Sequence, residues 1–249
     1  MGGDQVEGRQ AVRELLLARR RPVKEILMVD GLDDAPILAD IRELASDMKV
    51  PLKTVTRKRF EADALTMSHQ GVLAKAKPLE EKTLDGLLDV PTPFLLVLDG
   101  LTDPQNLGAI IRTAECAGVT GIVLPRHRAV HVTATVAKTA AGAVEHVPMA
   151  LVGGVPTAIT NLIDAGVLTV GLDADGDTPL FDLDLTGGRP VALVLGAEGA
   201  GLSRLVRQRV DVLARLPLMG ELNSLNVAMA SAAACFEVVR QRTRSTEPG

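Results

Sequence analysis

Apolar residues recur at two spacings along this chain, and the two spacings predict alternating helices and strands. From Arg9 to Ala18 the apolar residues recur every three to four positions, which is the spacing of one helix face. From Val191 to Leu195 every residue is apolar. Such an uninterrupted run indicates a strand buried on both faces, as in a parallel sheet. The pattern therefore predicts an α/β protein.

The amino-terminal part predicts a small α/β unit of its own. A charged stretch punctuated by prolines follows it, from Lys77 to Pro93, and is the best linker candidate. We therefore expect domains over residues 1–78 and 93–249, joined by a linker over 79–92. In the first domain we expect helices over 9–18, 37–48 and 59–64 and strands over 23–29, 52–55 and 71–76.

In the larger domain strands and helices alternate more regularly. We expect strands over 94–98, 121–124, 168–172, 191–195 and 212–216. We expect helices over 106–116, 133–144, 156–165, 202–209 and 225–242, and a frayed tail over 243–249. This alternation is typical of a domain built on a parallel sheet.

Composition narrows the range of functions. A chain of 249 residues that is 47% hydrophobic can bury a sizeable core. Four Phe and no Trp or Tyr exclude an aromatic platform for single-stranded nucleic acid. The two cysteines lack disulfide or zinc spacing and the four histidines lack metal-ligand spacing, so we expect a reducing cytoplasmic location and no metal. No apolar run reaches membrane-spanning length, so we expect a soluble protein.

The net charge of −4 argues mildly against a nucleic-acid-binding protein, but basic residues are clustered locally. Arginines stand at 19, 20 and 21, and Arg57, Lys58 and Arg59 form a second cluster. Each cluster is either a solvated surface or a place where phosphates bind.

Three short segments put small residues beside a few polar side chains, at predicted junctions between strands and helices. The first runs from Asp103 to Arg112 and includes Asn106, the second is Gly196–Gly201, and the third is Ser224–Asn226. Taken singly, each has a purely structural interpretation, namely helix caps at Asn106 and Ser224 and a tight turn in the glycine segment. The glycine order G-x-x-G-x-G also differs from the dinucleotide fingerprint. In open α/β sheets, however, such junctions are where ligands gather, so together the segments predict one pocket.

In their order along the chain, the three segments resemble the three motifs of the SpoU (TrmH) branch of the SPOUT methyltransferases, over about residues 93–242. Val6–Val12 and His69–Val72 resemble the ribosomal-protein-like substrate-binding domain of the RlmB-type members. The closing segment Phe236–Arg242 is similar to those members too. The resemblance thus covers nearly the whole chain.

The resemblance implies a fold and partners that the residue pattern does not predict. The implied catalytic domain is an α/β knot, a parallel sheet whose carboxyl-terminal chain threads a loop as a deep trefoil knot. General topology rules would have excluded a knot. The resemblance also implies S-adenosylmethionine bound by the knotted loops, and a homodimer whose active site takes residues from both subunits.

The implied activity is methyl transfer from S-adenosylmethionine to an RNA ribose 2′-hydroxyl. The arginine matching Arg112 would act on that hydroxyl, and electrostatic stabilisation is physically cheaper than proton abstraction by a guanidinium. The candidate catalytic residues are Arg112, Asn106, Glu198, Ser224 and Asn226. The candidate cofactor-binding residues are Leu195, Gly196, Gly199, Leu216, Leu218, Ser224 and Leu225. The candidate RNA-binding residues are Arg19, Arg20, Arg21, Arg57, Lys58 and Arg59.

The substrate is less closely determined than the reaction. The two-domain plan favours a guanosine of 23S rRNA. Relatives modify tRNA or confer antibiotic resistance by methylating an rRNA adenosine, and both alternatives stay open. A non-catalytic RNA-binding protein is a third alternative, which the intact Arg112, Glu198 and Asn226 disfavour.

Overall fold

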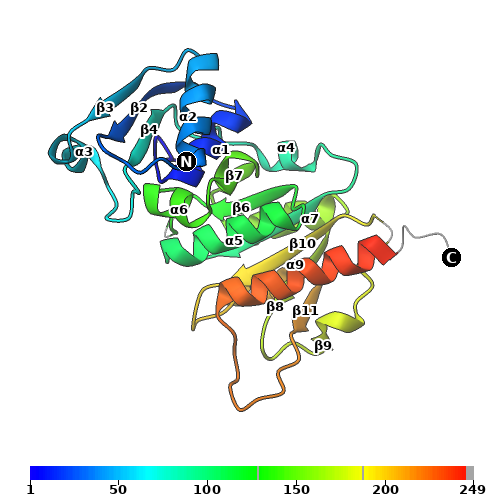
Figure 1. Ribbon diagram of the computed structural model, residues 1–249. Helices are drawn as coiled ribbons and strands as arrows, with labels where there is room; N and C mark the ends of the chain where they lie inside the picture. Colours follow the sequence, from blue (N-terminus) through cyan, green and yellow to red (C-terminus); the bar gives the residue numbers. More distant parts are fainter. Residues whose placement is uncertain (128, 187, 245–249) are drawn as a thin grey trace. The chain divides into compact units, whose positions relative to one another are not determined.

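The computed structural model describes residues 1–127, 129–186 and 188–244, so most of the expected frayed tail lies outside the described residues (Figure 1). The chain forms two compact units. The amino-terminal unit comprises Met1–Glu80, Leu107–Arg112 and His131–His146. The carboxyl-terminal unit comprises Glu81–Asn106, Thr113–Val130 and the chain from Val147 onward.

A four-stranded sheet organises the amino-terminal unit, in the order β1-β4-β2-β3. Strands β1 and β2 each pair antiparallel with β4, whereas β2 and β3 are parallel. The elements are β1 (Gln5–Glu7), α1 (Arg9–Ala18), β2 (Val23–Val29), α2 (Pro36–Asp47), β3 (Leu52–Val55), α3 (Arg57–Asp63) and β4 (Val72–Ala76). Residues 9–18, 23–29 and 52–55 form the elements that the sequence predicts, and β1 was not predicted.

The two faces of this small sheet are covered differently. Helices α1 and α2 bury Leu15, Leu16 and Ile41 in one cluster with residues from the sheet strands. In a second, smaller cluster, Phe60 of α3 packs with Leu27, Val29 and Leu73. Alternate residues of β2 and β4 thus enter opposite clusters, as the pleat of a strand requires.

A seven-stranded sheet organises the carboxyl-terminal unit, in the order β7-β6-β5-β10-β8-β11-β9, and every strand pair in it is parallel. The strands are β5 (Phe94–Asp99), β6 (Gly121–Pro125), β7 (Met149–Val152), β8 (Leu168–Leu172), β9 (Thr178–Pro179), β10 (Val191–Gly196) and β11 (Val212–Arg215). The helices that follow residue 80 are α4 (Leu84–Leu88), α5 (Pro104–Cys116), α6 (Ala134–Thr139), α7 (Val155–Asp164), α8 (Arg204–Arg209) and α9 (Val227–Arg244), with short 3-10 turns at Ala143–Glu145 and Leu180–Asp182.

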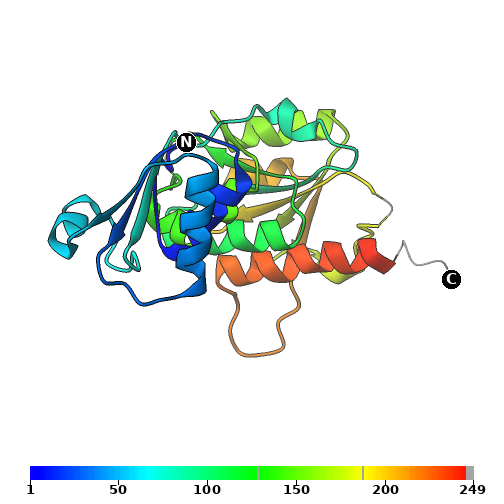
Figure 2. The ribbon, with the colours of Figure 1, turned by 45° about the horizontal axis from the view of Figure 1, so that its top comes forward.

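Helices cover both faces of the large sheet, which explains why its central strands are apolar throughout. Helix α9 runs along one face and α7 lies on the other (Figure 2). Along β10, Ala192 and Val194 belong to the cluster that contains Ile159 and Leu162 of α7. The α/β class with a parallel sheet is therefore as predicted.

Three local predictions need correction. The helix expected over 133–144 ends as α6 at Thr139, because Ala141 and Gly142 adopt left-handed φ values of 51° and 89°. Strand β7 was not predicted. The expected linker contains α4, whose Leu87 is buried in the core of the carboxyl-terminal unit.

The units also divide the chain differently from the expected domains. Residues 107–112 and 131–146, which we expected in the larger domain, belong to the same compact unit as residues 1–80. Within that unit Gly108 of α5 lies against Thr139, where an added Cβ would come within 2.5 Å of the threonine Cβ. Glycine at this position thus permits α5 to approach Thr139 closely.

Candidate active site

A cavity of about 450 Å³ lies in the carboxyl-terminal unit, beyond the ends of three parallel strands. Strand β8 ends at Leu172, β10 at Gly196 and β11 at Arg215, just before Leu216. Carboxyl ends of neighbouring parallel strands meet at one sheet edge, and ligand pockets of α/β proteins form there. All seven candidate cofactor-binding residues line this cavity: Leu195, Gly196, Gly199, Leu216, Leu218, Ser224 and Leu225.

The glycine-rich segment forms one wall of the cavity as a closed turn. Ala197 and Gly201 exchange two backbone hydrogen bonds of 3.0 and 2.8 Å. Gly199 and Gly201 adopt φ values of 76° and 66°, which favour glycine. A Cβ on Gly196 would overlap the backbone of Gly201. The glycines thus build a tight turn, and the same turn opens backbone surface to the cavity.

Asn106, Glu198 and Asn226 come together in a hydrogen-bonded triad next to this cavity. The Nδ2 group of Asn106 donates to Oε2 of Glu198 at 3.0 Å. The Nδ2 group of Asn226 donates to Oδ1 of Asn106 at 3.0 Å and, more weakly, to Oε1 of Glu198 at 3.4 Å. One residue from each of the three sequence segments therefore enters a single polar constellation.

The two amides stand at helix starts, and the Asn226 amide is itself a helix cap. The cap of α5 is Asp103, whose carboxylate accepts from the backbone N–H groups of Gln105 and Asn106 at 3.1 Å. The cap of α9 is Asn226, whose Oδ1 accepts from the N–H of Ala228 at 2.9 Å. The structural interpretations of Asn106 and Ser224 as caps are therefore wrong. The amide oxygen of Asn226 binds its own helix, so its NH₂ group faces Asn106 and Glu198.

The Glu198 carboxylate is exposed, and its donors are neutral amides. Among the residues that the structure describes, no Lys, Arg or His lies within 4.0 Å of it. Amide donors orient a carboxylate without pairing it with an opposite charge. Glu198 can therefore orient a donor or a cationic group of a ligand.

A second carboxylate on the cavity wall is neutralised instead. Asp173 follows β8 and pairs with Arg207 of α8 at 3.0 Å, and its Oδ1 also accepts from the N–H of Asp175 at 2.9 Å. Sequence analysis did not select Asp173. Its place directly after a predicted buried strand was the available signal, because that is where residues reach the cavity edge.

Arg112 stands six residues after Asn106 on α5 and belongs to the amino-terminal unit. Its side chain is exposed, and no hydrogen bond or ion pair to its guanidinium occurs among the described residues. Its guanidinium can therefore meet an anionic ligand, and its catalytic role stays a prediction.

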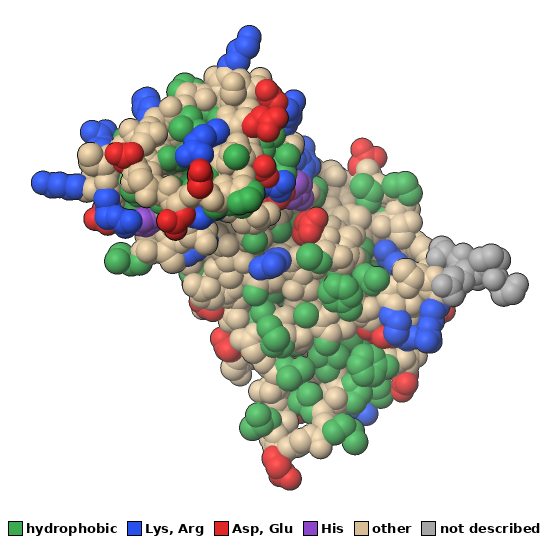
Figure 3. Space-filling view, in the orientation of Figure 1, with side chains coloured by type: hydrophobic (Ala, Val, Ile, Leu, Met, Phe, Trp, Pro, Cys, Tyr) green, Lys and Arg blue, Asp and Glu red, His purple; other side chains and the backbone are tan. Residues whose placement is uncertain are grey.

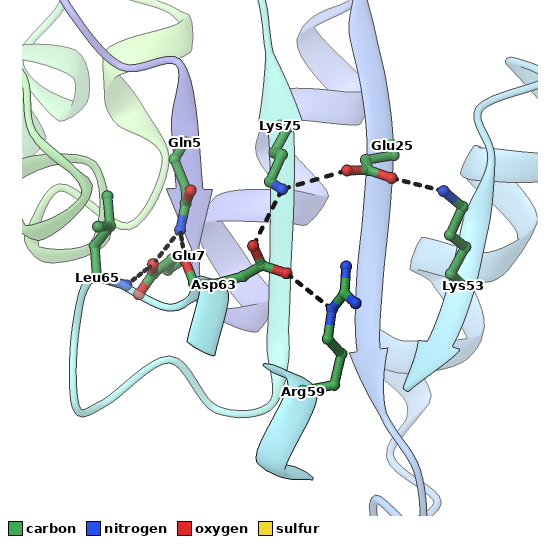
Figure 4. A network of polar contacts seen from close by, with 8 residues as sticks. All are labelled: Gln5, Glu7, Glu25, Lys53, Arg59, Asp63, Leu65 and Lys75. Atoms are coloured by element: carbon green, nitrogen blue, oxygen red, sulfur yellow. Dashed lines mark hydrogen bonds and ion pairs between the residues drawn. The ribbon is translucent and has the colours of Figure 1, made fainter. Parts of the chain in front are cut away.

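The basic cluster of Arg57, Lys58 and Arg59 begins α3 and is exposed. Two of its members form helical ion pairs, Arg57 with Glu61 at 3.8 Å and Arg59 with Asp63 at 3.6 Å. Figure 4 shows Arg59 at one end of a row of alternating charges that crosses the sheet. Ion pairs at exposed positions are weak, so these cations remain accessible to phosphates.

Arg21 differs from its exposed neighbours Arg19 and Arg20. It is 7% exposed, and its Nε donates to Oε2 of Glu145 at 2.8 Å. Its NH1 donates to the backbone oxygens of Gly3 and Lys77. The guanidinium is engaged inside the amino-terminal unit, so Arg21, contrary to the prediction from the sequence, is not available to an RNA phosphate.

The described residues contain neither a metal-binding cluster nor a helix suited to a membrane. No group of three His, Cys, Asp or Glu side chains is placed to hold a metal ion. Among the helices that are described, none has both the length and the apolar character needed to cross a membrane.

Comparison with known families matches both parts of the chain. Residues 93–236 match the sequence model described as the SpoU rRNA Methylase family. Residues 5–82 match the model described as RNA 2′-O ribose methyltransferase substrate binding. Each match contains segments that carried the resemblance in the sequence analysis.

Similar proteins are found along nearly the whole chain. The 23S rRNA (guanosine-2′-O-)-methyltransferase RlmB of Pseudomonas aeruginosa is 39% identical and aligns over 96% of this chain and 97% of its own length. RlmB of Shewanella oneidensis is 40% identical over 96% of this chain and 98% of its own. The solved structure of the SpoU methyltransferase AviRb from Streptomyces viridochromogenes with AdoMet has a TM-score of 0.80 and 26% identity, covering 96% of this chain and 90% of that one.

Proposed function

Because the chain belongs to the SpoU rRNA methylase family, we propose that it is an S-adenosylmethionine-dependent RNA 2′-O-methyltransferase acting on a guanosine of 23S rRNA. The single observation that carries this proposal is the triad of Asn106, Glu198 and Asn226 beside a glycine-walled cavity at the strand ends. The named activity of the relatives, which align over nearly the whole chain, supports the substrate.

The cavity fits S-adenosylmethionine in size and chemistry. Its volume lies within the range of small-molecule sites, roughly 300–1,000 Å³. Gly196 and Gly199 of the turn line the cavity without side chains, and apolar groups of Leu195, Leu216 and Leu225 line it beside them. AviRb has been solved with AdoMet bound. When bound, the cofactor would supply an electrophilic methyl group.

The chain's own residues would position and stabilise the RNA hydroxyl. Arg112 would stabilise the forming alkoxide, because a guanidinium gives up its proton too reluctantly to be an efficient base. Asn106, Glu198 and Asn226, oriented by their mutual hydrogen bonds, would hold the ribose and its neighbouring groups. Ser224, on the cavity wall, would contact the substrate or cofactor.

We further propose that the enzyme is a homodimer with a knotted catalytic domain, located in the cytoplasm. Figure 3 shows apolar side chains gathered on the carboxyl-terminal unit over α9. Met229 and Phe236 of that helix are 58% and 50% exposed, and Met219 and Leu222 of the preceding loop are 97% and 80% exposed. Large exposed apolar side chains on one surface favour association with a second copy.

Label transfer tests the proposal directly. The protein would be incubated with methyl-labelled S-adenosylmethionine and either protein-free 23S rRNA or bulk tRNA, and modified nucleotides would be mapped by mass spectrometry. We expect one labelled 2′-O-methylguanosine in 23S rRNA. Label in tRNA or on an rRNA adenosine would establish one of the alternative substrates, and RNA binding without any transfer would establish a non-catalytic binder.

A further inference from the structure

The loop over residues 64–70, between α3 and β4, presents two bare apolar side chains. Leu65 is 70% exposed and Met67 is 98% exposed. Large apolar groups at such exposure cost free energy in water. A mobile loop could turn them inward, so it matters how firmly the loop is held.

A buried carboxylate holds this loop. Glu7 of β1 is 0% exposed. Its Oε1 accepts from the backbone N–H of Leu65 at 2.6 Å, and its Oε2 accepts from the N–H and hydroxyl of Thr66 at 2.9 and 2.6 Å. Figure 4 shows the Glu7 carboxylate directed at the Leu65 backbone, with the Gln5 amide beside it. Charge-assisted bonds in a buried setting are strong, so the loop is preorganised with Leu65 and Met67 outward.

The far end of the loop is fixed as well. The His69 ring packs on Phe60 with ring centroids 4.7 Å apart, and its Nδ1 accepts from the N–H of Gly71 at 3.0 Å. Gln70 receives two hydrogen bonds from Arg9, of 3.0 and 3.2 Å. The two apolar side chains thus stand on a loop anchored at both ends.

Positive charge surrounds the loop. The guanidinium of Arg9 donates a hydrogen bond to the backbone oxygen of Gln70, and the ammonium group of Lys138 donates one to the Ser68 hydroxyl. The nearby acids are already engaged, since Glu7 is buried and Asp63 pairs with Lys75 at 3.4 Å. Neither cation forms an ion pair among the described residues. Apolar side chains next to such cations complement one kind of nucleic-acid target, an unstacked base with its flanking phosphates.

We propose that Leu65 and Met67 form the contact surface for an unpaired base of the RNA substrate, with Glu7 as the residue that positions them. The inference rests on the proposed function and specifies where that RNA is read. Aliphatic and thioether groups contact the face of any base, so the surface recognises an exposed base within a folded loop more than a particular sequence. It supplies the apolar contact that a chain with so few aromatic residues otherwise lacks.

Salt-dependent binding separates this contact from charge attraction. Binding of protein-free 23S rRNA would be measured at several salt concentrations for wild type, Leu65→Ala/Met67→Ala, Lys138→Gln and Leu17→Ala. Leu17 is a matched control, an apolar residue 42% exposed on α1 of the same unit. We expect the double variant to bind about tenfold more weakly at every salt concentration with an unchanged slope. Lys138→Gln should reduce the slope by about 0.7–0.9, and Leu17→Ala should match wild type.

A second variant tests the positioning role. Glu7→Gln keeps the side-chain shape but turns one acceptor into a donor facing backbone N–H groups, so hydrogen exchange at residues 65–70 should rise. RNA affinity should fall without any change in S-adenosylmethionine affinity. If the Leu65/Met67 double variant binds RNA with wild-type affinity, the proposal is wrong, and the surface would then bind a protein partner instead. If the wild-type protein neither binds nor methylates rRNA, both the proposed function and this inference fail.

Discussion

Glu145 lies in the amino-terminal unit and Glu198 in the carboxyl-terminal unit. Both oxygens of each carboxylate accept hydrogen bonds from planar side chains. Glu145 is 1% exposed, and its partner is the guanidinium of Arg21. Glu198 is exposed, and its partners are the amides of Asn106 and Asn226. The geometry is similar, whereas the charge of the partners and the access of water differ.

This difference separates a carboxylate that is satisfied inside the protein from one that is open to a ligand. A buried charge is costly unless its surroundings satisfy it, and Arg21 provides Glu145 with both an opposite charge and hydrogen bonds. Neutral amides, in contrast, fix the direction of Glu198 without cancelling its charge. A group meant to act on a ligand needs that combination, because the remaining charge is available to the ligand.

The largest expected effect is on the buried pair. Glu145→Ala leaves the Arg21 guanidinium buried without a counter-charge and should lower the free energy of unfolding by about 3–5 kcal/mol. Urea unfolding measures this. Glu25→Ala in the same unit removes a more exposed partner of Lys53 and should cost less than about 1 kcal/mol. Equal losses in the two variants would show that the burial of the Arg21–Glu145 pair is unimportant.

The next effect is on catalysis. Arg112→Ala should lower the rate of methyl transfer at least about 100-fold, because it removes the group proposed to stabilise the alkoxide. Thermal unfolding and S-adenosylmethionine affinity should be unchanged, since Arg112 is exposed. Near-normal turnover in this variant would refute its assignment.

Glu198→Gln is the matched counterpart of Glu145→Gln. The Glu198 substitution removes charge at an exposed position, so stability should change by less than about 0.5 kcal/mol while methyl transfer falls roughly 10–100-fold. Glu145→Gln should mainly lower the free energy of unfolding. Measuring unfolding and kcat for both variants checks the comparison, which fails if Glu198→Gln destabilises as much as Glu145→Gln.

The smallest expected effect concerns Asn226. Asn226→Ala removes the cap of α9 and should cost about 1 kcal/mol in unfolding free energy. Asn226→Asp retains the capping oxygen but directs a carboxylate at Glu198, so stability should be largely kept while activity falls. If Asn226→Asp retained full activity, the amide donor would have no role in the triad.

Much of the fold could be predicted because its signals are local. The apolar run of β10 indicates burial on both faces wherever it stands in the chain, and α1 follows from its apolar spacing. The break after Thr139 depends on two residues in left-handed conformation, which periodicity does not reveal. The three-residue strand β1 is too short to carry a pattern and is stabilised by pairing with distant β4.

The candidate site was predictable for a related reason. Gly196, Gly199 and Leu216 lie at strand ends, and parallel strands bring their carboxyl ends to one edge, so residues distant in sequence line one cavity. Asp173 was missed, although its strand was predicted, because a lone aspartate after a strand is common in turns.

The sequence by itself determined which segments form helices and strands, where glycine turns stand and which polar groups follow the strands, because each depends on a few neighbouring residues. Only the tertiary structure decided what those groups do. Three consecutive arginines look alike in sequence, yet Arg21 is buried because its partner Glu145 lies 124 residues away. Asn226 likewise caps a helix and binds Asn106, a partner 120 residues earlier, and only folding brings such distant groups into contact.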